Sequence, residues 1–172
     1  SKAVKKALHD RAAGDRQKPA SPASTTTPER TIVEFCCGDD SRMGQERFLD
    51  GNCTVRRLTI KNDLRTKSGP QAALKAVEGP RCLLWASIPC IGGTQSQRIN
   101  VTRPGGKARL RRHRKAFHEI WTNFEIVAER VHSLGGRIAI EWPTSCDYWR
   151  LGIVRRFVAR FSLQEAKCNG CA

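Results

Sequence analysis

The stretch RCLLWASIPCIGG, residues 81–93, decides the fold. Its first half is apolar without interruption and has the length of a strand, which predicts a strand covered on both faces of a sheet. Pro89 suits the end of such a strand because it offers no amide donor to the next ladder position. Cys90 and two glycines follow at once. The stretch therefore predicts a thiol at the carboxyl end of a buried strand.

Strands and helices alternate on both sides of this stretch. Further strands are expected over 31–35, 54–60, 137–143 and from 163 onward, and helices over 41–51, 69–80, 115–136 and 147–161. A long loop is expected between them over 90–115. This alternation predicts an α/β fold, a three-layer Rossmann-like sheet that is mostly parallel and has helices on both faces.

Length and composition suggest one domain with a tail. The 172 residues correspond to about one domain. Residues 1–30 are rich in Lys, Ala, Ser, Thr and Pro, which predicts a basic disordered tail and linker, with a short basic helix as an alternative over 1–15. The folded domain is expected over 31–172. The chain opens without Met and stops inside an apparent strand, so we expect a C-terminally truncated fragment.

The charge balance points to a polyanionic partner. Lys and Arg number 31 and Asp and Glu 16, for a formal charge of +15. Such an excess is most often typical of nucleic-acid binding. No apolar run reaches the roughly 18 residues of a membrane span, and the N-terminus lacks a signal-peptide core. We therefore expect an intracellular protein, nuclear or cytoplasmic, without membrane contact, whose eight cysteines are reduced thiols.

The end of the first expected strand carries residues suited to a nucleoside cofactor. In parallel sheets, ligands bind outside the carboxyl ends of the strands. The carboxylate of Glu34 on the strand could accept hydrogen bonds from hydroxyl or amino groups of such a ligand. The turn at Gly38, which opens a helix, would direct backbone amides toward it. The Gly-x-Gly-x-x-Gly pattern is missing, and Asp39 and Asp40 would repel a pyrophosphate, which disfavours NAD. An ordinary strand-to-helix turn is the alternative.

Two further strand ends carry reactive side chains. A thiol at Cys90, next to an Arg-rich segment, is expected to be partly exposed and biased toward thiolate; the alternative is a buried structural cysteine. Glu141 lies within the apolar run IAIEWP. A carboxyl group in such surroundings can stay protonated and donate a proton; the alternative is a pair with one of the many arginines.

Together these motifs resemble the catalytic domain of DNA cytosine-5 methyltransferases, which are S-adenosylmethionine-dependent and Rossmann-like. The resemblance covers residues 31–172 in the motif order of that family. It is carried by VEFCCGDDSRMG (33–44), NDLRT (62–66), LLWASIPCIGG (83–93) and RIAIEWP (137–143). The chain departs from the family in its Cys-Cys-Gly-Asp-Asp turn, in the Trp that follows Glu141, and in lacking the downstream Gln-x-Arg-x-Arg segment.

The resemblance implies methylation of cytosine C5 in nucleic acid. Cys90 would attack C6 of a flipped-out cytosine, Glu141 would hold the N3 edge of the ring, and S-adenosylmethionine would provide the methyl group. No metal is implied. The residues implied for cofactor binding are Glu34, Phe35, Gly38, Asp40, Asp63 and Pro89.

The stretch RPGGKARLRRHRK, residues 103–115, is the candidate nucleic-acid contact. In the resembling family the stretch after Pro-Cys is a mobile loop, and the glycine pairs 92–93 and 105–106 would act as hinges. DNA is favoured over RNA. A solvated charge run or a nuclear-localisation patch are the alternatives. The seven cations are Arg103, Lys107, Arg109, Arg111, Arg112, Arg114 and Lys115.

Three other functions compete with this interpretation. The first is a non-catalytic, basic nucleic-acid-binding domain that keeps the methyltransferase shell, as part of a viral or mobile-element polyprotein. The second is a methyltransferase of another class, which the cysteine in SIPC disfavours. The third is a zinc module built from Cys36, Cys37, Cys168 and Cys171, disfavoured because adjacent cysteines cannot easily supply two tetrahedral ligands.

Overall fold

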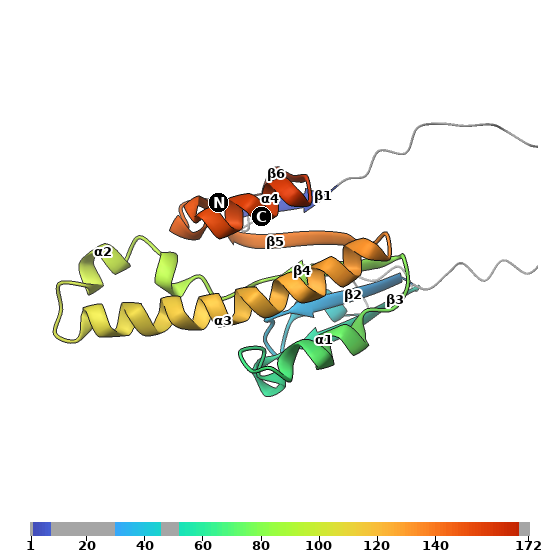
Figure 1. Ribbon diagram of the computed structural model, residues 1–172, viewed down its shortest axis with the longest axis horizontal. Helices are drawn as coiled ribbons and strands as arrows, with labels where there is room; N and C mark the ends of the chain where they lie inside the picture. The colour runs from blue at the N-terminus through green and yellow to red at the C-terminus, as the bar shows by residue number, and fades with distance from the viewer. Residues whose placement is uncertain (1, 8–29, 46–51, 169–172) are drawn as a thin grey trace, which may run out of the picture.

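The computed structural model describes residues 2–7, 30–45 and 52–168. Its centre is a six-stranded sheet in the order β3-β2-β4-β5-β1-β6, shown in Figure 1. Four neighbouring strands are parallel and confirm the prediction of an α/β fold with a mostly parallel sheet. These strands are β3 (Cys53–Leu58), β2 (Arg30–Phe35), β4 (Cys82–Ala86) and β5 (Arg137–Pro143).

The sheet is extended by two strands from the ends of the described chain. The expected final strand is present as β6 (Leu163–Cys168), and β1 (Lys2–Ala7) lies between β5 and β6, antiparallel to both. For residues 2–7 the prediction of a disordered tail or basic helix is therefore wrong. Backbone pairing explains the strand, because β5 and β6 each offer it a row of ladder donors and acceptors. Residues 8–29 of the predicted linker lie outside the described residues.

The longer described helices pack on one face of the sheet. They are α1 (Gly69–Ala76), α3 (Gly106–Ser133) and α4 (Gly152–Arg160). α1 contacts α3, β2 and β3, and α3 contacts β4 and β5. No helix within the described ranges packs on the opposite face, so the described residues form two layers where the sequence predicted three, with helices on both faces. The helix expected over 41–51 is present only as the 3-10 turn η1 (Arg42–Gly44), and residues 46–51 lie outside the described residues.

An aromatic core joins α3 and α4 to the sheet. The Phe124 ring lies 5.4 Å from that of Phe35 on β2 and 5.2 Å from that of Phe157 on α4, and the Trp121 ring lies 5.8 Å from that of Trp142 on β5. Burial of each such side chain contributes roughly 1.5–3 kcal/mol. The predicted stripe of α3 is confirmed. Its buried members are Phe117, Ile120, Trp121, Phe124, Val127, Ala128 and Val131.

α3 starts about ten residues earlier than predicted. Residues 106–115 form its first turns and are not a mobile loop. Gly105 is left-handed, with φ 70°, and Gly106 packs tightly on the carbonyl oxygen of Asn100 in α2 (Gln97–Asn100), so this glycine pair fixes the start of the helix. The following Lys, Ala, Arg and Leu are good helix formers. Neither α3 nor another described helix combines the length and apolarity that crossing a membrane needs.

Candidate functional site

The chain reverses direction across the sheet between β2 and β4. From β2 it moves outward to β3, and it then returns across β2 to β4 and β5. In open α/β sheets the crevice outside the carboxyl ends at such a point is where ligands bind. Two cavities lie at this edge, one on each face of the sheet. We call them the helix-side cavity and the open-face cavity.

The helix-side cavity has a volume of about 520 Å³. Its walls come from the turns after three parallel strands and from α3, which contributes His113 and Phe117. This volume lies within the range of small-molecule sites, roughly 300–1,000 Å³. The strand-end residues include Cys36, Cys37, Ile60, Asp63, Leu64, Pro89 and Gly92.

The turn that carries Asp63 is held by hydrogen bonds at both ends. Asp63 closes the 3-10 turn η3 (Ile60–Asn62) in a left-handed conformation, and Thr59 and Asn62 form a capping box over that turn. From α3, the buried Asn123 donates to the carbonyl oxygens of Leu64 and Thr66, at 2.7 and 2.9 Å. Sequence reasoning missed Asn123. Its signal was a polar residue within the apolar stripe of α3.

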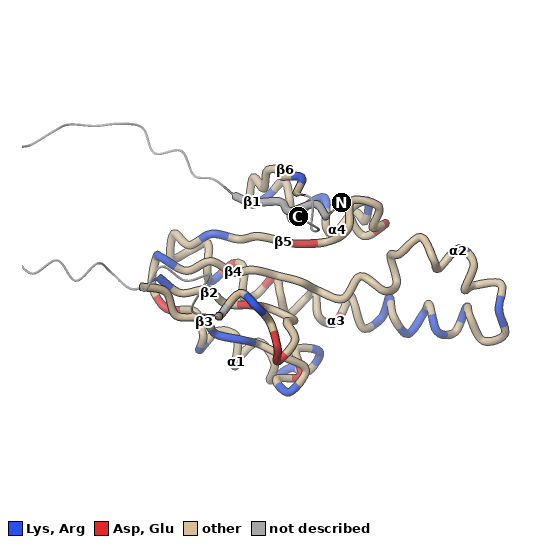
Figure 2. Tube along the Cα trace, turned by 180° about the vertical axis from the view of Figure 1, so that it is seen from behind, with Lys and Arg blue, Asp and Glu red and all other residues tan. Residues whose placement is uncertain are grey.

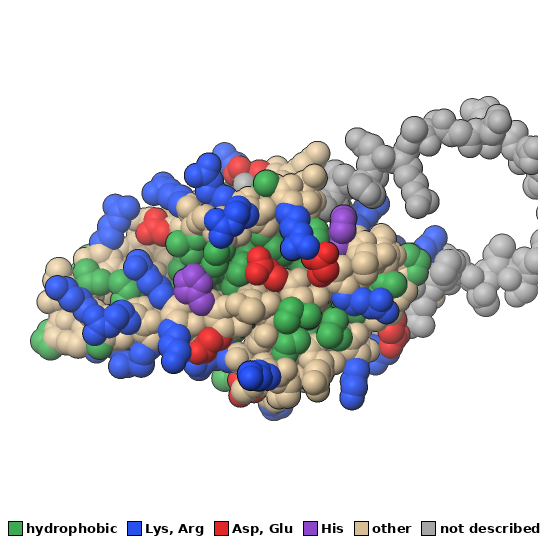
Figure 3. All heavy atoms as spheres, in the orientation of Figure 1, with side chains coloured by type: hydrophobic (Ala, Val, Ile, Leu, Met, Phe, Trp, Pro, Cys, Tyr) green, Lys and Arg blue, Asp and Glu red, His purple; other side chains and the backbone are tan. Residues whose placement is uncertain are grey.

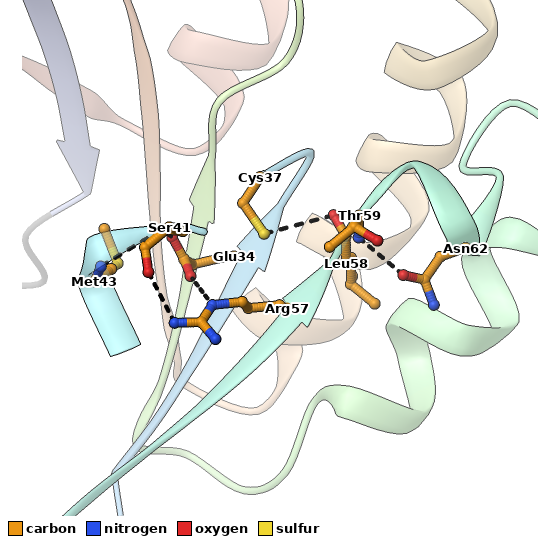
Figure 4. Close-up of polar contacts among 8 residues, drawn as sticks. All are labelled: Glu34, Cys37, Ser41, Met43, Arg57, Leu58, Thr59 and Asn62. Carbon is orange, nitrogen blue, oxygen red and sulfur yellow. Dashed lines mark hydrogen bonds and ion pairs between the residues drawn. The ribbon is translucent and has the colours of Figure 1, made fainter. Parts of the chain in front are cut away.

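The open-face cavity, of about 570 Å³, has Glu34, Trp85 and Glu141 among its lining. Glu34 is 3 % exposed and accepts a 2.5 Å hydrogen bond from Ser41 Oγ, as Figure 4 shows. Arg57 Nε lies 3.4 Å from the second carboxylate oxygen, an ion pair without a well-formed hydrogen bond. Glu34 is therefore a buried carboxylate paired with an arginine, the arrangement that the sequence offered as an alternative for Glu141.

Cys36 and Cys37 contribute to both cavities. Burial, and secondarily the neighbouring Cys37, raise the pKa of Cys36 to about 12. Burial also raises the pKa of Cys37, whose Sγ lies 3.8 Å from the carbonyl oxygen of Leu58. Both thiols therefore stay neutral near pH 7, and the walls they provide are weakly polar and uncharged.

Cys90 lies at the end of β4 as predicted, but its surroundings differ from those expected. It is half-buried and begins the 3-10 turn η4 (Ile91–Gly93). Its thiol neighbours that of Cys146, and this neighbour together with burial raises the pKa of Cys146. Tyr148, two residues further on, packs on Phe117 of α3 with ring centroids 3.9 Å apart. Cys90 therefore faces the Cys146 turn on the helix side.

The structure brings Cys90 and Glu141 to one edge of the sheet but not into one cavity. β4 and β5 are neighbours, with Ala86 opposite Ile140. Glu141 lines the open-face cavity, where Ser87 Oγ lies 3.5 Å from its Oε2. Cys90 is in the lining of neither cavity described here.

The residues predicted to bind the cofactor are divided in the same way. Asp63 and Pro89 line the helix-side cavity, and Glu34 and Gly38 the open-face cavity. Asp40 is exposed in the turn after β2 and lines neither. The Phe35 side chain lines neither cavity. It is fully buried against Phe124, because alternate residues of β2 point to opposite faces of the sheet.

The first turns of α3 carry a run of exposed cations beyond the sheet edge, as Figures 2 and 3 show. No acidic residue lies in the first helical turn. In the described part of the chain, Lys115 has an ion pair, 3.9 Å long, with Glu119, whereas no ion pair links Lys107 or Arg109 to an acid. Cations at a helix N-terminus oppose the helix dipole. The run therefore lowers helix stability unless an anion binds. The cations are Lys107, Arg109, Arg111, Arg112, Arg114 and Lys115.

The described residues contain no cluster of three or more His, Cys, Asp or Glu side chains that could hold a metal ion. Cys171, one ligand of the zinc interpretation, lies outside the described residues. Comparison of the chain with known protein families, with curated proteins and with solved structures finds no match. The functional inference therefore rests on the two cavities at the switch point, the placement of Cys90 and Glu141, and the cationic start of α3.

Proposed function

We propose that this chain is an S-adenosylmethionine-dependent methyltransferase domain that acts on nucleic acid, DNA in preference to RNA, and has a Rossmann-like sheet. The observation that carries the proposal is the helix-side cavity at the switch point between β2 and β4. This is the position at which sheets of this kind bind nucleotide-type ligands.

The lining of this cavity suits a nucleoside without phosphates. Leu64 and Phe117 provide apolar surfaces for a base, and Asp63 provides a carboxylate for hydroxyl or amino groups. S-adenosylmethionine carries a positive sulfonium and no phosphate, and its chemical contribution is an electrophilic methyl group. The thiols of Cys36 and Cys37 add uncharged surface to the wall. Arg65, which also lines the cavity, is paired with Glu119 at 2.8 Å.

The cationic start of α3 supports a nucleic-acid partner. The same helix contributes His113 and Phe117 to the helix-side cavity, so a polyanion bound to its first turns lies next to that cavity. Residues 87–116 contain no Phe, Tyr or Trp. Single-strand binders commonly stack bases on aromatic side chains, and this segment offers none. We therefore propose that the segment contacts duplex phosphates.

The proposed reaction is methylation of cytosine C5. Cys90 adds to C6 of the base, and Glu141 holds the N3 edge. Because Cys90 contacts Cys146 and Glu141 faces the other side of the sheet, the reaction requires Cys90 to leave Cys146 and turn toward the base. That separation favours a second candidate function, a non-catalytic nucleic-acid-binding domain that keeps the cofactor-binding shell.

Calorimetry with S-adenosylmethionine tests the cofactor site. We expect the folded chain to bind it and Asp63→Ala to weaken binding by about tenfold or more, since a charged hydrogen-bond partner is lost. Glu165→Ala, on the exposed side of β6, is the control and should leave the affinity unchanged. Absence of binding by the folded chain, or equal losses in both variants, would contradict the proposal.

Radioactive methyl transfer to duplex DNA separates the two candidate functions. Cys90→Ser should abolish transfer while leaving S-adenosylmethionine and DNA binding intact. A wild-type chain that binds both ligands without transferring a methyl group would identify the non-catalytic function. Equal transfer by Cys90→Ser and wild type would exclude the covalent step.

A further inference from the structure

Two thiols from distant turns meet at the edge of the candidate site. Cys90 follows β4 and begins η4, Cys146 follows β5, and the Cys146 thiol lies against the turn that Cys90 begins. Cys146 is 3 % exposed, whereas Cys90 is half-buried. The two turns are already in contact, so a disulfide between these cysteines would join segments that the fold has placed side by side.

The packing of the two turns fixes this contact. A Cβ added to Gly93 would lie 3.0 Å from Cys146 Sγ, and one added to Gly92 would lie 2.2 Å from Tyr148 Oη. The amide of Gly93 donates to the carbonyl oxygen of Cys90 at 2.8 Å. The two glycines thus let the Cys90 turn lie directly on the Cys146 turn.

We propose that Cys90 and Cys146 form a reversible disulfide that switches off the site, a role that rests on the proposed function. The oxidant is a small-molecule disulfide such as oxidised glutathione. The half-exposed Cys90, as thiolate, attacks one glutathione sulfur and releases the first glutathione thiolate. Cys146 loses its proton, attacks the Cys90 sulfur and releases the second. The two cysteines give up two protons and two electrons, and oxidised glutathione becomes two reduced molecules.

The disulfide removes the sulfur that the proposed reaction needs. It also ties the turn after β4 to the turn after β5, so that Cys90 cannot move toward Glu141.

Peptide mapping of the full chain tests the proposal. The chain is equilibrated with glutathione buffers of increasing oxidised fraction, the remaining thiols are alkylated, and the protein is digested with trypsin. The expected product links the peptide of residues 82–98 to that of residues 138–150, and dithiothreitol reverses it. Because the first peptide also contains Cys82, Cys82→Ala is the matched control. It should keep the link, and Cys90→Ser should lose it.

Mass spectrometry detects the linked peptides whether or not the chain transfers methyl groups. A failure of the disulfide proposal can therefore be told apart from a failure of the proposed function. Oxidation of the exposed Cys168 shows that the buffer is oxidising enough. If Cys90 and Cys146 are both recovered alkylated under those conditions, the disulfide is overturned. A link that persists in Cys90→Ser would also overturn it. If the chain transfers methyl groups, activity should fall with the linked fraction and return on reduction. Cys146→Ala lacks the second attack, so it should stop at the mixed disulfide of Cys90 with glutathione and give no linked peptide. Inactivation of the wild type without the linked peptide would overturn the switch.

Discussion

Glu34 on β2 and Arg57 on β3 lie directly opposite each other in the parallel pairing, with Arg57 Nε 3.4 Å from Glu34 Oε2. The same guanidinium donates to the carbonyl oxygen of Ser41, at 2.8 Å. Ser41 in turn donates to the other oxygen of Glu34. One buried carboxylate thus joins two strands to the turn that borders the open-face cavity.

Arg57→Ala should lower the free energy of unfolding by about 2 kcal/mol, because a buried carboxylate loses its compensating charge. Arg56→Ala is the matched control. Its ion pair with Glu78 has both side chains about half exposed, so the loss should be below about 1 kcal/mol. Urea denaturation measures both values. Equal losses would show that the Glu34 pair is no more important for stability than a surface pair.

Gly106→Ala should destabilise the chain, although alanine normally favours a helix over glycine by about 1 kcal/mol. A Cβ at this position would lie 1.9 Å from the backbone carbonyl oxygen of Asn100, so α2 or α3 must shift. We expect a loss of about 1–3 kcal/mol. At Gly152 the nearest contact is the flexible end of Arg156, at 3.3 Å. Gly152→Ala should therefore leave the melting temperature unchanged or raise it. Thermal melts of both variants measure the difference.

Stability should fall as the pH rises above 9. Burial raises the pKa of Cys82 from 9.0 to about 11, and burial with the neighbouring Cys37 raises that of Cys36 to about 12. From pH 9 up to the raised pKa values, the thiols of the unfolded chain lose their protons while those of the folded chain keep them. Rising pH therefore favours unfolding. Each thiol contributes at most about 1.4 kcal/mol per pH unit. Melts from pH 8 to 10.5 should show a steeper decline for wild type than for Cys82→Ala.

Lys107→Glu with Arg109→Glu should have opposite effects on stability and binding. An acidic side chain in the first helical turn interacts favourably with the helix dipole and stabilises the helix by about 0.3–1 kcal/mol per residue. The melting temperature should therefore rise. DNA affinity should fall, and the slope of log affinity against log salt should become shallower by about 1.8 for the two lost phosphate contacts. Lys75→Glu with Arg155→Glu, both exposed elsewhere, is the control for net charge. A similar loss of affinity in the control would exclude a specific contact by α3.

Several features could be predicted from local sequence. The apolar run before Pro89 predicted β4, and the helical spacing of Phe117, Trp121 and Phe124 predicted the buried face of α3. Both signals depend only on the repeat of strand or helix and on apolar burial. The start of α3 was missed because its first turns carry solvent-exposed cations and no apolar stripe. The glycine pair before it indicated a loop.

The sequence by itself determined the order of the four parallel strands and of the three longer helices, and the edge at which the candidate residues gather, because these follow from hydrophobic periodicity and chain connectivity. Only the tertiary structure decided that Lys2–Ala7 joins the sheet, that Glu34 pairs with Arg57, and that Cys90 meets Cys146 and not Glu141. The physical reason is that backbone pairing and side-chain contacts between distant segments depend on register and on the face to which each residue points. A one-residue change reverses that face, and no local pattern encodes which turns will meet.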